Sequence, residues 1–156
     1  IEAVVRQALD GLGMAYEVLA CDPQYADTAQ FCEQYGYAPD ECGNTILVGS
    51  RREPKEYSAC VVKASDRLDV NKTVRKLMGV RRLSFASTEE TIEVTGMMIG
   101  GVTTFALPKE IPFYVDAKVM DLDTVILGSG SRSSKIRVAP AVFHLISAQV
   151  IEGLSL

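Results

Sequence analysis

Residues that many familiar active sites require are scarce in this chain. Its 156 residues include one histidine, four cysteines and no tryptophan. The cysteines show no C-x-x-C spacing, which is typical of zinc knuckles and redox dithiols. We expect no Cys/His metal site, and no Ser-His-Asp triad unless His144 reaches a cleft. We expect the thiols to be buried and reduced, with a Cys32–Cys42 disulfide as the alternative.

Long apolar runs are also absent. No segment approaches the ~20 apolar residues that a membrane-spanning helix needs, and the first residues show no basic start followed by an apolar block, the pattern of a signal peptide. We therefore expect a cytoplasmic protein without membrane contact. The length, with 47% hydrophobic and 23% charged residues, fits one globular domain spanning 1–156.

The net charge of −4 argues against a general nucleic-acid binder, but it hides an asymmetry. Residues 1–42 carry eight acids and one base, whereas residues 51–82 carry ten bases and four acids. The basic middle permits a phosphate-contacting face, although a solvated surface is the simpler interpretation.

Short helical and strand patterns alternate irregularly along the chain. Helical spacing, caps and glycine stops predict helices over 2–12, 28–35, 68–77, 88–95 and 140–146, the fourth capped by Thr88. Apolar and β-branched runs predict strands over 16–19, 45–48, 57–63, 82–85, 113–116, 124–127, 135–138 and 149–151. Tight turns between strands favour a mixed, largely antiparallel α+β domain.

Two loops could carry chemistry. In 100–105, Gly100 and Gly101 can bring backbone N–H groups close to a carbonyl or developing oxyanion; an ordinary tight turn is the alternative. In 128–134, four hydroxyls and Arg132, with Lys135 close by, suit phosphate or ribose oxygens. A polar hairpin turn is the alternative there, and the loop does not match the G-x-x-x-x-G-K-[ST] phosphate-binding pattern.

Asp116 ends an apolar strand, where a carboxylate can anchor loop N–H groups or serve as a general base. We favour the anchoring role.

The order of these segments resembles a known family. It runs through Thr45-Ile-Leu-Val48, Val61-Val62, Leu68-Asp69, Thr95-Gly96, Gly100-Gly101-Val-Thr, Leu107-Pro108, Tyr114-Val-Asp116, Gly128-Ser-Gly-Ser-Arg132, Lys135-Ile136 and Ala139-Pro140. Over roughly residues 12–152 this series is similar to the YbaK-like family, also called the prolyl-tRNA synthetase-associated editing domain.

The resemblance implies a compact fold with a mixed barrel-like sheet, and hydrolysis of the ester joining a wrong amino acid to tRNA, most often cysteine or alanine on tRNA for proline. It implies no metal or organic cofactor, and as partners the 3′ end of an aminoacyl-tRNA and a synthetase. From the residues and the resemblance together we expect the catalytic set Gly100, Gly101, Asn44, Lys63 and Asp116, in which Lys63 depends on a predicted hairpin pairing. The implied substrate-binding set is Thr45, Val102, Thr103, Thr104, Gly128, Ser129, Gly130, Ser131 and Arg132.

Asn44 is the main departure from that family, whose members with editing activity typically carry a lysine there. Thr104 and Ala106 also stand where the family often has proline and glycine. Asn44 cannot supply a cation. One hypothesis pairs it with Lys63 across the hairpin, bringing the ammonium into the same space; a slip of one residue would send Lys63 to the other face. The alternative function is a non-catalytic module that binds an aminoacyl-tRNA or amino acid.

Overall fold

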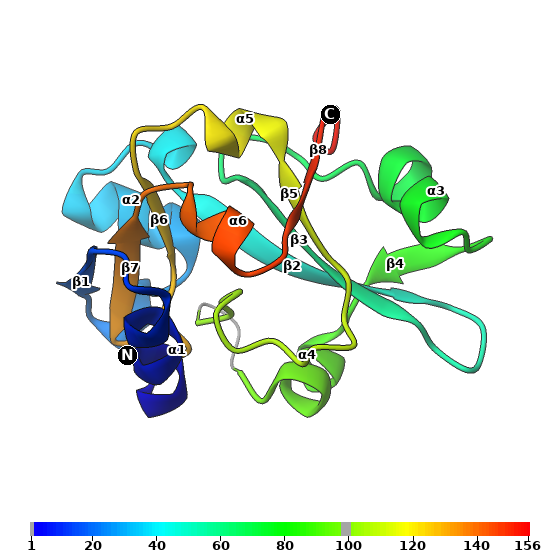
Figure 1. Cartoon of the computed structure of the whole chain (residues 1–156), viewed down its shortest axis with the longest axis horizontal. Coiled ribbons are helices and arrows are strands. Elements are labelled where there is room, and N and C mark those ends of the chain that lie inside the picture. The colour runs from blue at the N-terminus through cyan, green and yellow to red at the C-terminus, as the bar shows by residue number, and fades with distance from the viewer. Residues whose placement is uncertain (1, 98–100) are drawn as a thin grey trace.

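Short helices surround two β-sheets in the computed structural model, which describes residues 2–97 and 101–156 (Figure 1). The helices are α1 (Ala3–Leu12), α2 (Thr28–Tyr35), α3 (Arg75–Met78), α4 (Thr88–Thr95), α5 (Ala117–Met120) and α6 (Val142–Leu145). The strands are β1 (Tyr16–Ala20), β2 (Gly43–Ser50), β3 (Tyr57–Lys63), β4 (Leu83–Phe85), β5 (Phe113–Asp116), β6 (Val125–Gly128), β7 (Ser134–Val138) and β8 (Gln149–Ile151).

The first sheet has the strand order β1-β7-β6 and is antiparallel throughout. The second has the order β4-β2-β3-β5-β8, in which β5 runs parallel to both of its neighbours and the other pairs are antiparallel. The predicted mixed, largely antiparallel arrangement is confirmed. The expected barrel is corrected, because the strands form two separate sheets rather than one that closes on itself.

Strand β7 separates two clusters of side chains. Ile136 and Val138 belong to the main core, together with Val5 and Leu9 of α1. Successive residues of a strand point to opposite faces, so Lys135 and Arg137 face the other way, as their contacts with rings of the α2 region confirm. The sheet therefore presents a lysine to the side covered by α2.

Local signals set most helix ends. Helices α1, α2 and α4 stop at Gly13, Gly36 and Gly96, each in the left-handed conformation that glycine adopts most readily. The expected cap of α4 is corrected by one residue. Ser87, not Thr88, is the N-cap, because its Oγ accepts the N–H of Glu90 at 3.0 Å.

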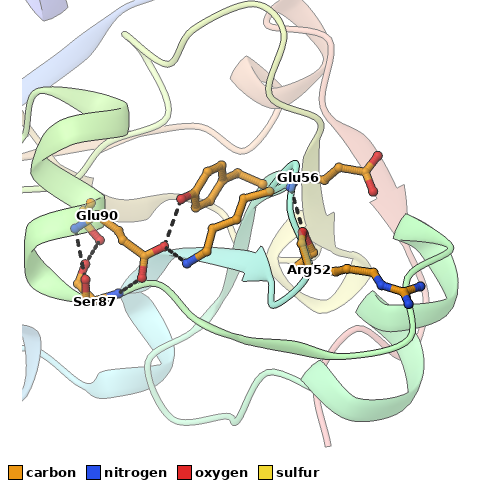
Figure 2. Close-up of polar contacts among 8 residues, drawn as sticks. Arg52, Glu56, Ser87 and Glu90 are labelled. Atoms are coloured by element: carbon orange, nitrogen blue, oxygen red, sulfur yellow. Dashed lines mark hydrogen bonds and ion pairs between the residues drawn. The ribbon is translucent and has the colours of Figure 1, made fainter.

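The β2–β3 hairpin is fastened to α4 by Glu90, as Figure 2 shows. The Glu90 carboxylate accepts from Lys55 Nζ at 3.0 Å and from the Tyr57 hydroxyl at 2.9 Å. These bonds, with one from the backbone N–H of Ser87, lower the pKa of Glu90 to about 2. At the hairpin end, the N–H of Glu56 donates to Ser50 Oγ at 2.8 Å.

None of the helices within the described ranges combines the length and apolar character needed to cross a bilayer.

Candidate functional site

A cavity of about 260 Å³ opens between α2, β2, β6 and β7. Its lining residues are Asp27, Thr28, Phe31, Cys42, Gly43, Asn44, Thr45, Ile46, Leu47, Phe85, Ala86, Thr91, Val102, Ile126, Leu127, Gly128 and Lys135. The cavity is smaller than the ~300–1,000 Å³ typical of sites for drug-sized ligands, so it suits a small group rather than a whole nucleotide.

The cavity brings together four of the predicted site residues: Asn44, Thr45, Val102 and Gly128. The other predicted residues that the structure describes do not line it: Lys63, Gly101, Thr103, Thr104, Asp116, Ser129, Gly130, Ser131 and Arg132. Gly100 lies outside the described residues.

The two glycine-bearing loops lie backbone to backbone at the wall of the cavity. A Cβ built on Gly128 would sit 2.1 Å from the carbonyl oxygen of Val102, and one on Gly101 would sit 2.9 Å from the carbonyl oxygen of Ser131. The N–H of Gly130 donates to the carbonyl of Gly101 at 2.7 Å. Glycine is required at 101 and 128 by close approach, which explains why segments far apart in sequence meet here.

Asn44 and Thr45 lie near the start of strand β2, which forms another wall of the cavity. The hydroxyl of Thr28, in the first turn of α2, donates to Asn44 Oδ1 at 2.7 Å, which fixes the amide so that its NH₂ group remains available as a donor. Thr45 Oγ1 is buried and has no hydrogen-bond partner among the described residues. A buried hydroxyl of this kind is costly unless something binds it.

Lys135 is the one basic side chain among the described residues that line the cavity. It is 5% exposed, and its Nζ lies 5.7 Å from the centre of the Phe31 ring, within cation–π range. Burial lowers the pKa of this lysine, because desolvation disfavours the charged form. From the sequence we identify Lys135 only as a neighbour of the 128–134 loop. The alternation of side chains along β7 is the signal that predicts its side chain on the face covered by α2.

The Lys63 hypothesis is corrected by the hairpin register. Gly43 pairs with Lys63, and Asn44 pairs with Val62, one residue away from the expected pairing. Directly opposed residues share a face and adjacent residues do not. Lys63 therefore points to the opposite face from Asn44.

The hydroxyls of the 128–134 loop bind one another. Ser129 is fully buried, and its Oγ donates to the carbonyl of Ser134 at 2.9 Å and lies 2.9 Å from Ser134 Oγ. Ser131 N donates back to Ser129 Oγ at 3.3 Å. This network of hydrogen bonds stabilises the loop, so Ser129 has a structural role in the hairpin.

Arg132 links the same loop to α2. Its Nη1 lies 3.2 Å from Asp27 Oδ1, and its Nη2 donates to the carbonyl of Pro23 at 2.8 Å. Since Asp27 lines the cavity, this ion pair positions one of the walls.

Asp116 lies away from the cavity lining. It caps α5 by accepting the N–H of Lys118 at 3.4 Å, and it accepts a hydrogen bond from the Ser155 hydroxyl. The anchoring role that we favoured is the one that its contacts support. Thr103 is also turned inward, where its Oγ1 accepts from the N–H of Phe105 at 3.5 Å.

All four cysteines are free and buried, as predicted. Cys32 and Cys42 lie 3.5 Å apart between their Sγ atoms, and burial raises the pKa of Cys42 far above its ordinary value. In the ranges 2–97 and 101–156, no group of three or more His, Cys, Asp or Glu residues is placed to hold a metal ion.

Two solved structures share the fold of this chain. A crystal structure described as hypothetical protein APE2540 matches with a TM-score of 0.86 at 23% identity, covering 98% of this chain and 99% of that one. A structure described as "a putative trans-editing enzyme for prolyl tRNA synthetase" matches with a TM-score of 0.80 at 22% identity, covering 97% of each chain. Identities this low show a shared fold alone.

Proteins with a similar sequence give a second line of evidence on the family. YwhH of Bacillus subtilis (strain 168), an uncharacterized protein, is 35% identical over 109 residues, 65% of this chain and 69% of that protein. The "Putative Cys-tRNA(Pro)/Cys-tRNA(Cys) deacylase EbsC" of Enterococcus faecalis (strain ATCC 700802 / V583) is 24% identical over 108 residues, 69% of this chain and 63% of that protein. The model of the aminoacyl-tRNA editing domain family matches residues 22–144. With most of its length matched, the chain belongs to the aminoacyl-tRNA editing domain family.

Proposed function

We propose that this chain hydrolyses the ester bond between a wrongly attached amino acid and the 3′ end of a tRNA. The meeting of the Val102 and Gly128 backbones at the wall of a small cavity carries the proposal, in a chain that belongs to an editing family. A backbone N–H at such a wall would suit an acyl carbonyl, because it can donate to that oxygen, whereas the Val102 carbonyl cannot.

In this proposal the aminoacyl group enters the cavity beside the Val102–Gly128 wall, with its carbonyl oxygen turned toward a donor and away from the Val102 carbonyl oxygen. The amide NH₂ of Asn44, oriented by Thr28, donates to the substrate. Water adds to the carbonyl carbon, the bond from that carbon to the ribose oxygen breaks, and the proton from water ends on the ribose oxygen. The products are a free amino acid and an uncharged tRNA.

Cysteine or alanine on tRNA for proline is the proposed substrate. A cavity of about 260 Å³ favours a small acyl group, and the printed name of the relative EbsC contains Cys-tRNA(Pro). The reaction would take place in the cytoplasm, either by the free protein or beside a prolyl-tRNA synthetase.

The terminal base would stack on Phe85 at the mouth of the cavity. Phe85 is 59% exposed although it is a large apolar side chain, and it lines both the cavity and the next hollow along the surface. Exposed aromatic rings are the usual stacking platforms for single-stranded nucleotides.

The phosphates that precede the terminal nucleotide would follow the basic end of the hairpin. Two further hollows continue from Phe85 and share Ser50 and Arg51. The farther hollow is also lined by Arg52, Arg81 and Arg82, which are exposed. Guanidinium groups arranged in this way can neutralise phosphates and release their counterions.

A panel of charged tRNAs tests the proposal. The chain is incubated with Cys-, Ala- and Pro-tRNA for proline, and with Ser- and Thr-charged tRNAs. Release of cysteine or alanine well above spontaneous hydrolysis supports the proposal. Tight binding with no release on any member of the panel supports the alternative, a binding module.

A further inference from the structure

Lys135 is the one buried cation in the cavity lining of the described residues, and the register of β7 explains how it gets there. Gly128 lies directly opposite Lys135 in the antiparallel β6–β7 pair, so their side-chain directions share a face. From Gly128 that direction leads to the carbonyl oxygen of Val102. The Lys135 side chain therefore leaves its strand on the face that the Val102 segment approaches.

The groups around Lys135 come from four parts of the chain. The Phe31 ring of α2 lies under its Nζ. Four titratable groups influence it electrostatically: Cys21, Cys42, Asp27 and Arg132. Burial raises the pKa of both thiols, so they stay neutral. Asp27 is the carboxylate of the group, and it also forms the ion pair with Arg132.

The burial of a lysine at position 135 calls for a physical explanation. Lysine is among the residues least often buried, because removing its ammonium from water is costly. Replacing a buried charge together with its partners by apolar side chains is often neutral or stabilising, so the burial of a cation is weak evidence of a role in stability. The same desolvation makes the ammonium a stronger partner for a negative charge that arises inside the cavity. The cation thus fits a role toward a bound ligand better than a role in folding.

We infer that the Lys135 ammonium contacts the ester carbonyl oxygen and stabilises the negative charge that forms on it when water adds to the carbonyl carbon. This inference rests on the proposed function. The electron pair of the C=O bond moves to oxygen next to Nζ and returns when the bond to the ribose oxygen breaks. Lys135 keeps its proton throughout, so it acts by charge and not by proton transfer.

The test compares single-turnover hydrolysis and steady-state kinetics of the wild type and Lys135→Met on Cys-tRNA for proline. Loss of an oxyanion partner costs about 100-fold or more in kcat, with KM within about threefold because the ground-state carbonyl carries little charge. Met has a similar length and no charge, and the melting temperature of each variant, measured beside its kcat, separates a loss of folding from a loss of catalysis. Arg137→Met, on the same face of β7 but outside the cavity lining, is the matched control and should keep the wild-type kcat.

A second arm separates a catalytic cation from a packing role. Asn44→Lys in the Lys135→Met background puts an ammonium back into the cavity from β2 and should restore kcat at least tenfold. The wild-type rate should fall at high pH as Lys135 loses its proton, and this fall should be missing in Lys135→Met. The Lys135→Gln variant repeats the comparison if Lys135→Met does not fold.

The outcomes are distinct. An inactive wild type defeats the proposed function, and this inference with it. An active wild type whose Lys135→Met and Lys135→Gln variants retain its kcat overturns this inference alone and leaves the proposed function standing.

Discussion

Gly128 lies directly beneath the carbonyl oxygen of Val102, so close that a Cβ on Gly128 would sit 2.1 Å from that oxygen. The obstacle is backbone, which cannot turn aside as the end of a flexible side chain can. The wall of the cavity can therefore hold its position only because residue 128 has no Cβ.

Gly128→Ala is expected to push the Val102 segment outward. Overpacking at such a site costs about 1–3 kcal/mol of stability, and the displaced wall should lower hydrolysis by at least tenfold. Denaturant unfolding and deacylation kinetics measure the two effects. Gly11→Ala is the matched control, because a Cβ there meets nothing within 4 Å and alanine favours the α1 helix by up to about 1 kcal/mol. Wild-type activity in Gly128→Ala would contradict the role given to this close approach.

Phe85→Ala should weaken tRNA binding while the fold persists. Stacking of a base on an aromatic ring is worth about 1–3 kcal/mol, so KM should rise roughly tenfold, with kcat at saturation little changed. The side chain is 59% exposed, so the loss of stability should be small. Phe85→Trp retains a stacking face and should keep the wild-type KM. Equal KM values for the alanine and tryptophan variants would show that Phe85 does not stack on the terminal base.

Arg81→Glu combined with Arg82→Glu should reduce the salt dependence of tRNA binding. Each phosphate that the protein no longer neutralises lowers the slope of log affinity against log salt by about 0.7–0.9. Binding at several salt concentrations measures the slope. Arg6→Glu, on α1 at the opposite end of the molecule from the hairpin (Figure 1), changes the net charge by half as much and is the control for a charge change away from the hairpin. An identical slope in the double variant and the wild type would place the phosphates elsewhere.

Glu90→Gln should change how stability depends on acid. The pKa of Glu90 is lowered to about 2 from 4.5 by the bonds from Lys55, Ser87 and Tyr57. Its ionised form therefore stabilises the fold fully above about pH 4.5, and this contribution disappears as the pH falls toward 2. Thermal unfolding between pH 6 and 2 should show a shallower decline in Glu90→Gln than in the wild type. The exposed neighbour Glu89→Gln is the control, and parallel curves for Glu90→Gln and the wild type would contradict the prediction.

Most helices and strands could be predicted from the sequence because their signals are local. Glycine after an apolar periodic run ends α1, α2 and α4 at Gly13, Gly36 and Gly96. Helix α5 was not predicted, since its four residues are too few to show a helical period. Its position depends on the capping carboxylate of Asp116.

The candidate site was only partly predictable, because it depends on pairings between distant segments. The two glycine loops could be recognised separately, but their meeting depends on Gly128 approaching Val102. The positions of Lys63 and Lys135 depend on strand register and side-chain alternation. The turn between β2 and β3 set Lys63 one residue away from Asn44's partner position, and the alternation of β7 turned Lys135 toward the cavity.

The measurement that tests the central claim most directly is cysteine release from Cys-tRNA for proline, with protein in excess over tRNA. We predict release at least tenfold faster than in buffer alone, with Pro-tRNA for proline left intact and with most of the rate lost in Lys135→Met. Release at the buffer rate, for cysteine and for alanine alike, would contradict the claim.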